Sequence, residues 1–442
     1  MKNGVFLMMK ISVCKLSGGK MSLAYTIISD LWRLPRHFAS SGYDEAVAYL
    51  KKILPFREIK FTSEDECNGW IIPPKWEVLQ ALIIKDNKII LDGMKHPLSV
   101  VSHSLSFEGN VDLKTLKQHL HYDNRYNDAI PYHFRYSYRP WDRDWGFCVT
   151  KNFYESLEDG IYSIKIKTLE DEPELKIIDY RIQGESDYEF LFVAHLDHPG
   201  MANDDLSGCA VGCELMNELS KQKTKFSYRL ILVQEIIGSQ LYLEKIFKNN
   251  IIGGVFLEML GVNINLSMQS SYAETSSMDY FLKKALKEYN CENILEFKSI
   301  IGNDELVFES YGIPMPSLIR FPYPEYHCDK DNIDIIEQSK LSEAIAILLK
   351  MVEFIEDDIV INKKFKGVMC LSNPNCNLYV DSGQPAFGKN DDNIQMRRVM
   401  DYLSIMPETE FLSILCHKFK INKNVVYEYL KKWADHHLIE MI

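Results

Sequence analysis

Several features that would point to other classes of protein are missing from the sequence. It has no excess of positive charge, because 50 Lys and Arg stand against 62 Asp and Glu, for a formal net charge of −12. This balance argues against nucleic acid or an anionic membrane as the main partner. The ten cysteines form no paired framework, since Cys209/Cys213 and Cys370/Cys376 each lack the second half of a zinc motif. Such cysteine usage favours a reduced, cytoplasmic protein.

Long apolar runs are missing as well. Near the N-terminus, Val5–Met9 is the only apolar run, and it is too short for a signal peptide or a membrane span. We therefore expect no membrane partner. With 46% hydrophobic and 25% charged residues, the composition is that of an ordinary globular protein. A chain of 442 residues exceeds a single hydrophobic core, which predicts two or three units.

The first 150 residues contain two regions of different texture. Residues 22–61 show apolar positions at helical spacing, which predicts two N-terminal helices separated at Leu34-Pro35. Residues 62–150 are rich in short β runs and aromatic residues, with a hairpin expected around Asp86-Asn87. We predict an inserted β-rich domain here that narrows the functional site. The alternative is that its aromatic residues only fill its own core.

The remaining chain alternates strands and helices before a separate tail. Residues 151–370 predict an α/β domain with a doubly wound, mostly parallel sheet, to which we assign the strand at 162–169. Residues 390–442 predict three helices that suit a winged helix. The last of these, 423–437, mixes lysines with acids, so we expect protein contact or homo-oligomer formation rather than DNA binding.

Polar side chains follow four of the predicted strands of the α/β domain. They are His195, Asp197 and Asp204 after the first strand, Glu235 and Glu258 at the ends of the next two, and His327 after the last. Because the carboxyl ends of parallel strands meet at one edge, these groups could bind one divalent metal. For the first strand alone, a polar turn with Asn203-Asp204-Asp205 as a helix N-cap explains the residues equally well. Four such strand ends together favour a metal site.

The segment HLDHPG…ANDDLSG resembles the zinc exopeptidase superfamily of bacterial leucyl aminopeptidase and glutamate carboxypeptidase. The strings LDHPGMANDDLSG, QEIIGS and YPEYH resemble most a bacterial aminopeptidase-like group with an inserted β domain and a C-terminal winged helix. The resemblance extends from about Ser22 to the C-terminus. It implies an aminopeptidase with one or two Zn²⁺, acting on a peptide or an aminoacylated small substrate.

The resemblance also implies roles for individual residues. The metal ligands would be His195, Asp204, Glu258 and His327, with Asp204 bridging two ions or binding one. Glu258 stands where the family usually has an aspartate. Asp197 would orient the His195 ring through its other nitrogen.

One departure from the family concerns the second strand end. The family usually has two adjacent glutamates, a general base and a zinc ligand, whereas this chain has Gln234-Glu235. If Glu235 is the base, the second metal lacks a ligand. If Glu235 is the ligand, Asp304 or Glu305 must take the proton, unless these two bind the free amine of the substrate. We favour Glu235 near the metal water and keep Glu305 as the further catalytic candidate and Asp304 as a substrate contact.

For Tyr326 and His198, the sequence gives weaker evidence of a role in the site. Tyr326 could form a wall of the substrate pocket, although aromatic packing explains it equally well. His198 could be a metal ligand, but a loop histidine beside a proline, here Pro199, is more often structural. Two rival functions stay open: a one-zinc acyltransferase resembling glutaminyl cyclase, and a degenerate peptidase that serves as a binding or regulatory module.

Overall fold

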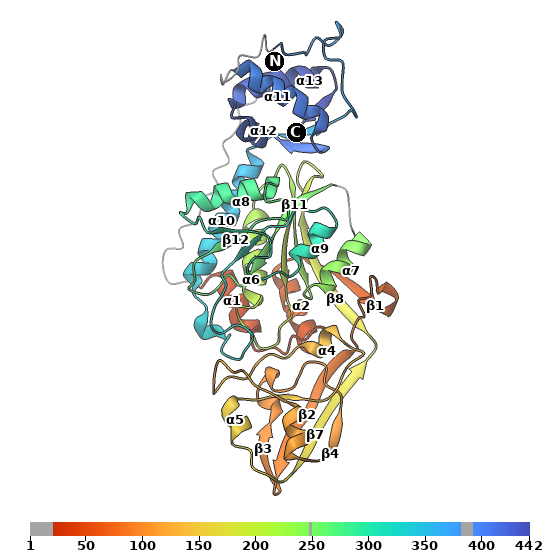
Figure 1. The fold of residues 1–442 in the computed structure, drawn as a ribbon, viewed down its shortest axis with the longest axis vertical. Helices are drawn as coiled ribbons and strands as arrows, with labels where there is room; N and C mark the ends of the chain where they lie inside the picture. The colour runs from red at the N-terminus through yellow and green to blue at the C-terminus, as the bar shows by residue number, and fades with distance from the viewer. Residues whose placement is uncertain (1–20, 247–249, 382–391) are drawn as a thin grey trace. The chain divides into compact units, whose positions relative to one another are not determined.

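The computed structural model describes residues 21–246, 250–381 and 392–442 (Figure 1). The N-terminal run Val5–Met9 lies outside these ranges. Within them the chain forms two compact units, one ending at Leu349 and the other beginning at Lys350. Among the helices of the described ranges, none combines the length and the apolar character needed to cross a membrane.

The first unit is built on an eight-stranded sheet with the order β1-β8-β10-β9-β11-β14-β12-β13. Its strands are β1 (Arg57–Thr62), β8 (Glu174–Ile182), β9 (Glu189–His195), β10 (Ser227–Val233), β11 (Ile251–Glu258), β12 (Ser267–Gln269), β13 (Ile294–Leu295) and β14 (Ser317–Ile319). Strands β10, β9, β11 and β14 are parallel neighbours, whereas β1 pairs with β8, β8 with β10, and β12 with β14 in antiparallel fashion. The predicted α/β class is confirmed, but the sheet is mixed at both flanks.

The centre of the sheet explains the apolar runs in the sequence. Every residue of β9 and β10 is buried, because helices cover the parallel strands on both faces. Outside the inserted domain, the described helices of the unit are α1 (Leu23–Leu31), α2 (Ser41–Ile53), α6 (Leu206–Leu219), α7 (Ile237–Ile246), α8 (Ser277–Glu288), α9 (Glu305–Ser310) and α10 (Gln338–Glu356), which continues past Leu349. In the sheet, β10 lies on one side of β9, and β11, which follows later in the chain, lies on the other side. The carboxyl end of β9 is therefore a switch point, where ligands bind in open α/β sheets.

Helix α6 approaches the sheet unusually closely. Gly208, in its first turn, lies where a Cβ atom would come within 2.3 Å of the Leu257 carbonyl oxygen on β11. Only glycine permits this approach. Asp205 caps the helix by accepting from the Gly208 amide at 3.2 Å, and it also accepts from the Met259 amide at 2.8 Å. The N-cap interpretation of this segment is therefore correct for Asp205.

The inserted domain has its own four-stranded antiparallel sheet, with the order β3-β2-β7-β4. Its elements are β2 (Lys75–Lys85), β3 (Lys88–Asp92), β4 (Phe107–Asp112), α3 (Leu113–Gln118), β5 (Leu120–His121), α4 (Arg135–Tyr138), β6 (Phe147–Cys148), α5 (Lys151–Glu155) and β7 (Ile161–Asp171). The predicted hairpin between β2 and β3 is confirmed. Asp86 and Asn87 at its turn have φ of 50° and 63°, as a type I′ turn requires.

Strand β7 corrects the sequence-based assignment of residues 162–169 to the α/β sheet. It pairs with β2 and β4, so the smaller sheet extends past residue 150. Tyr162, Ile164 and Ile166 alternate into the core of the inserted domain together with Trp76 and Trp145. The alternating pattern identified a strand with one buried face, but it does not specify which sheet provides the neighbours.

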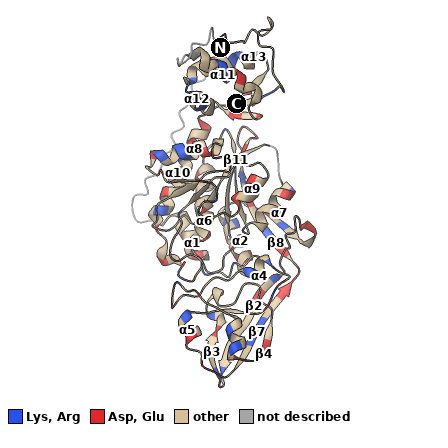
Figure 2. Ribbon diagram, viewed as in Figure 1, with Lys and Arg blue, Asp and Glu red and all other residues tan. Residues whose placement is uncertain are grey.

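The second unit contains three helices and a small antiparallel sheet with the order β16-β15-β17. Its elements are β15 (Val360–Lys363), α11 (Asp392–Ile405), β16 (Thr409–Phe411), α12 (Leu412–Phe419), α13 (Lys423–Asp435) and β17 (Ile439–Met441). Leu403, Leu415 and Trp433 form part of its core. Figure 2 shows both signs of charge on its helices. The winged-helix classification and the protein-contact role stay predictions.

Candidate metal centre

The candidate site begins at the last residue of β9. His195 is completely buried, and its backbone amide donates to Asp205 at 3.2 Å. Its ring nitrogens face two carboxylates: Nδ1 lies 3.3 Å from Asp197 Oδ1, and Nε2 lies 3.5 Å from Asp204 Oδ1. Asp197 also accepts from the Glu235 amide at 3.0 Å. The Asp197 carboxylate is thus fixed between β9 and the end of β10, and it sets the orientation of the imidazole.

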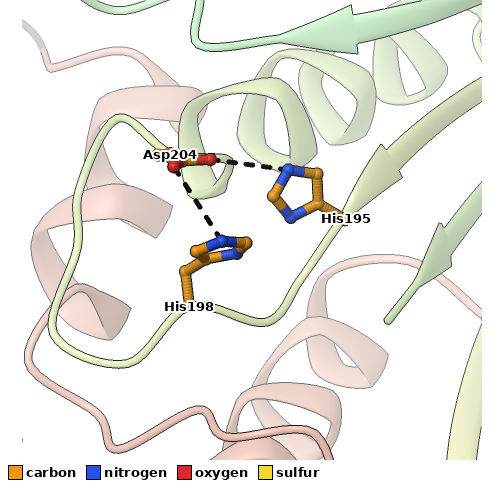
Figure 3. A group of neighbouring side chains, drawn as sticks. All are labelled: His195, His198 and Asp204. Atoms are coloured by element: carbon orange, nitrogen blue, oxygen red, sulfur yellow. Dashed lines mark ion pairs between the residues drawn. The ribbon is translucent and has the colours of Figure 1, made fainter. Parts of the chain in front are cut away.

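Asp204 lies at the centre of three imidazoles. Besides His195, the Nε2 atoms of His327 and His198 lie 3.2 Å and 3.9 Å from its Oδ2 atom. Figure 3 shows His195 and His198 both directed at Asp204. These nearby imidazoles lower the Asp204 pKa although burial alone would raise it. The sequence therefore placed His195, Asp204 and His327 in one site, as the structure does.

The loop that carries Asp204 is shaped by a second, remote carboxylate. Asp331 accepts hydrogen bonds from three consecutive backbone amides, those of Ala202, Asn203 and Asp204, at 3.1, 2.7 and 3.1 Å. It also accepts from the Tyr323 hydroxyl at 2.6 Å. Burial raises the pKa of Asp331 to about 7. The position of Asp204 is consequently defined by protein contacts alone.

His198 also lies inside the cluster, although the sequence favours a structural role for it over a ligand role. Its ring is 2% exposed. Potential ligand atoms of His195, His198 and Asp204 lie within 4.8 Å of one another, and so do those of Asp197, His198 and Glu235. The spacing His195-x-Asp197-His198 was the available signal. It was obscured by Pro199, which suggested a turn.

The two glutamates at strand ends occupy different surroundings. Glu235 lies just after β10, with Oε2 4.0 Å from His198 Nε2, and it accepts a hydrogen bond from the Tyr138 hydroxyl. Glu258 closes β11 and is completely buried; Asn303 donates to its Oε1 atom. Burial, reinforced by the charge of Glu305, raises the pKa of Glu258 well above its ordinary range. A nearby cation would offset this desolvation cost.

The other predicted residues line the same region. Asp304 accepts from the Ile236 amide at 3.0 Å, and burial raises its pKa to about 7. Glu305 is 2% exposed, accepts from the Asn303 amide at 2.8 Å, and has a pKa raised by burial. The Tyr326 ring stacks on the His327 ring at a centroid distance of 3.8 Å. All three therefore belong to the neighbourhood of the centre, with Tyr326 on the side of His327.

Buried polar atoms without partners indicate whether these residues suit a metal ion. Among the described residues, they include both ring nitrogens of His195, Nδ1 of His198, Oδ2 of Asp204 and Oε2 of Glu258. Buried groups of this kind are normally hydrogen-bonded, so a cluster of unpaired ones needs an explanation. Imidazole nitrogen and carboxylate oxygen are ligands that zinc accepts. The donor set fits a divalent metal, and zinc in particular.

Protonation is consistent with this interpretation. Burial opposes charge on the His195 ring, but the adjacent Asp197 carboxylate, 3.3 Å away, outweighs it and raises the His195 pKa well above its usual range. The His195 position therefore favours a positive charge, whereas burial lowers the His198 pKa. A metal cation replaces the ring proton when it binds to imidazole.

Two sets of contacts to the site left no local signal in the sequence. Arg36 is completely buried and donates to the carbonyl oxygens of Leu196, His198 and Met201 at 3.0, 2.9 and 2.9 Å. The inserted domain contributes aromatic rings. Those of Tyr132 and Phe134 lie 4.9 Å from His198 and 5.4 Å from His327, respectively.

The inserted domain is also joined to the loop of His327 through the backbone. The Tyr132 amide donates to the His327 carbonyl oxygen at 2.9 Å, and Pro131 and Cys328 form an antiparallel bridge. The domain therefore covers the site directly. This agrees with the expectation that it narrows the site, while Trp145 and Phe147 show that other aromatic residues fill its own core.

Comparison with known proteins agrees with the fold described above. The family described as a domain of unknown function (DUF4910) matches residues 25–358. A candidate polysaccharide biosynthesis protein with an aminopeptidase-like domain from Clostridium acetobutylicum is 28% identical over 351 residues, which cover 77% of this chain and 79% of that protein.

Comparison with solved structures also agrees with this fold. The crystal structure of a candidate peptidase from Clostridium acetobutylicum has a TM-score of 0.73 at 24% identity, covering 95% of this chain and 96% of that one. A zinc aminopeptidase from Bacillus subtilis has a TM-score of 0.59 at 15% identity, covering 76% of this chain and 96% of that one. The chain thus belongs to the DUF4910 family and has the fold of the zinc aminopeptidases.

Proposed function

We propose that this protein is a metal-dependent peptidase, and specifically a zinc aminopeptidase. The observation that carries the proposal is the convergence of His195, Asp204 and His327 at the switch point of the sheet, beside the Glu235 carboxylate. The imidazoles and Asp204 would hold the metal, and Asp197 would keep the His195 ring in position. Such an arrangement combines metal ligands with a separate acid–base group, as peptide hydrolysis requires.

The reaction would divide its tasks among these residues. Bound zinc supplies polarisation of the scissile carbonyl and a lowered pKa for the attacking water. Glu235 would accept the proton of that water on its carboxylate and deliver it to the leaving amine, a step typically worth ~10²–10⁴-fold in rate. The Tyr138 hydroxyl, which donates to Glu235, would keep this carboxylate aimed at the centre. The rings of Tyr326 and Tyr132 would exclude bulk water on the side of His327.

A cluster of buried acids supports the preference for a free amino terminus. Glu258 and Glu305 are both buried, and each has a carboxylate oxygen without a hydrogen-bond partner among the described residues. Asp304 adds a third such oxygen. An ammonium group would relieve the desolvation of these carboxylates, whereas a blocked amino terminus would not.

A second candidate function has one observation in its favour. The Gln234 side chain turns away from the centre and donates to the carbonyl oxygens of Phe38 and Lys176, both at 3.1 Å. Glu235 is consequently the only carboxylate of the Gln234-Glu235 pair near the cluster. A single-metal acyltransferase that cyclises N-terminal glutamine, of the glutaminyl cyclase kind, would need no second carboxylate at this pair of positions.

One set of assays separates these functions. The zinc-loaded protein is incubated with short peptides that have free or acetylated amino termini, and with a peptide that begins with glutamine. We expect hydrolysis of the free peptides, loss of that activity after chelation, and little hydrolysis of the acetylated set. Cyclisation without hydrolysis would favour the acyltransferase. A protein that retains zinc and acts on none of them would contradict both enzymatic functions.

A further inference from the structure

We propose that His198 is a metal ligand that compensates for the glutamate missing at position 234, and that this leaves Glu235 free to act as the base. The first part concerns metal binding alone. The second part rests on the proposed function, because a general base has meaning only for an active hydrolase.

The surroundings of the His198 ring are those of a ligand. Its Nε2 atom lies 3.9 Å from Asp204 Oδ2, on the same carboxylate that His195 and His327 approach. Its Nδ1 atom lies 3.4 Å from Asp197 Oδ2 but makes no hydrogen bond to the described residues, although the ring is 2% exposed. It is also the one residue shared by the two groups of potential ligands at this site. A histidine that served only to fill space would have its buried ring nitrogens hydrogen-bonded.

An unusual backbone conformation at His198 orients this ring. His198 has a φ of 77°, in the left-handed region that residues with a side chain seldom adopt. The conformation is maintained from outside, because Arg36 donates to the His198 carbonyl oxygen at 2.9 Å. Strained conformations of this kind concentrate at functional sites. In this case the strain directs the imidazole toward Asp204 (Figure 3).

The ligand count explains why such a residue is needed. Catalytic zinc sites usually have three protein ligands and one open position. Gln234 is an amide whose nitrogen is engaged with backbone carbonyls away from the cluster. With His198 in the set, His195, His198 and Asp204 suffice for one metal ion, and His327 is available as a further ligand. Glu235 then remains outside the set, held by the Tyr138 hydroxyl.

The competing explanation is packing. The Tyr132 ring lies edge-on to His198 at 4.9 Å, so the imidazole could simply support the inserted domain. The two explanations differ in their consequences for metal affinity. Packing predicts that replacing His198 changes the stability of the fold but leaves zinc affinity unchanged.

The test measures zinc affinity of the full-length protein by competition with a chelator. His198→Gln retains polar character and a similar size but removes the imidazole ligand. Loss of a residue that only supports a ligand typically weakens binding 10–100-fold, so loss of a ligand should reach at least the upper end, about 100-fold. His121→Gln is the matched control, because His121 stacks on His133 in the inserted domain and should leave affinity unchanged. Unchanged affinity in a folded His198→Gln protein would overturn the proposal.

A second measurement covers the case in which His198→Gln does not fold. X-ray absorption of the zinc-loaded His327→Gln protein counts the imidazoles around the metal when position 327 cannot contribute one. We expect two imidazoles, those of His195 and His198. A count of one for a stoichiometrically loaded protein would exclude His198.

The role of Glu235 is tested in the same titration. Glu235→Gln should keep wild-type zinc affinity, and a loss as large as that of His198→Gln would make Glu235 the ligand and overturn the second part. The outcomes separate this inference from the proposed function. Zinc held by His198 in a protein that hydrolyses nothing contradicts only the peptidase function. Peptide hydrolysis by the wild type, combined with an unchanged zinc affinity in His198→Gln, contradicts only the present inference.

Discussion

The candidate centre has two walls of contrasting chemistry. The sheet wall consists of His195, Asp197, Asp204 and Glu258, all on or just after β9 and β11 and at most 2% exposed. The insert wall consists of Tyr132, Phe134 and Tyr138, which are aromatic and touch the site through ring contacts and one phenol. The contrast indicates a division of labour. On the proposed function, the fold shared with zinc aminopeptidases would supply charge and ligands, while the inserted domain would supply closure and orientation.

The largest effect should come from the centre of the sheet wall. Asp204→Ala removes the carboxylate that three imidazoles surround, so the protein should lose most of its zinc and all measurable peptidase activity while remaining folded. Metal content of the purified protein and its circular dichroism spectrum check this. Asp159→Ala is the control, because that aspartate is exposed on the inserted domain. Unchanged zinc in both Asp204→Ala and His327→Ala would place the metal elsewhere.

Glu235 lies where the two walls meet. It follows a strand of the large sheet, and its carboxylate accepts a hydrogen bond from the Tyr138 hydroxyl of the inserted domain. Glu235→Gln preserves shape and removes proton acceptance. We expect kcat to fall by ~10²-fold or more with zinc retained, the usual scale for loss of a general base. Steady-state kinetics with parallel zinc analysis provide the measurement. Full activity together with full zinc would leave Glu235 without either role, and Asp304→Asn and Glu305→Gln would then be the variants to compare.

The insert wall should have a smaller effect, and one that depends on Glu235. Tyr138→Phe removes the hydrogen bond to the carboxylate, which is worth about tenfold in kcat for a bond to a charged group. In the Glu235→Gln background the same change should cost little, because interacting residues are not additive. Tyr136→Phe provides the control, as that phenol has no side-chain hydrogen bond to the described residues of the site. Equal losses in both backgrounds would mean that Tyr138 acts independently of Glu235.

An effect on stability rather than on activity concerns the acid next to the sheet wall. Burial raises the Asp304 pKa from 3.8 to about 7, so in the metal-free protein the folded state keeps a proton that the unfolded state releases. Between about pH 4 and pH 7, each unit of rising pH should lower the free energy of unfolding by up to ~1.4 kcal/mol through this group, with no further change above pH 7.

Asp304→Asn should remove that contribution, so its stability relative to the wild type should rise across this range. Urea unfolding at several pH values in the presence of a chelator measures the difference, with Asp159→Asn as the control. Parallel stability curves for the wild type and Asp304→Asn would show that Asp304 ionises normally. The sheet wall would then be less dehydrated than the burial of its residues indicates.

The sequence predicted most residues of the sheet wall, whereas for the insert wall it predicted only that the inserted domain narrows the site. His195 and Glu258 end apolar strands, and strand polarity alone brings such ends to one edge. Tyr138, by contrast, meets Glu235 across 97 residues, and no periodicity relates the two positions. The same holds for β7, whose alternation was clear although its partner strands were not. Pairing between distant segments depends on packing that local patterns do not encode.

His198 illustrates a different limit. Its neighbours in sequence, Asp197 and Pro199, are typical of a polar turn, and only its positive φ and the contact with Arg36 direct the ring inward. Neither feature is visible in the residue string. The acidic pair Asp304 and Glu305 was proposed as an alternative proton acceptor or as the site of the substrate amine, but its burial and raised pKa values required the structure.

The long-range hydrogen bonds of Arg36 have a consequence for the order in which parts of the protein fold. Its guanidinium reaches Leu196 and His198 across 160 and 162 residues of chain, and on its other side it donates to Leu31 at the end of α1 at 2.6 Å. Long closures of this kind are entropically costly and form late. During refolding, recovery of the helical signal should therefore precede zinc uptake, and simultaneous recovery would contradict this sequence of events. The loop of His198 that Arg36 holds would be the last part of the α/β unit to form.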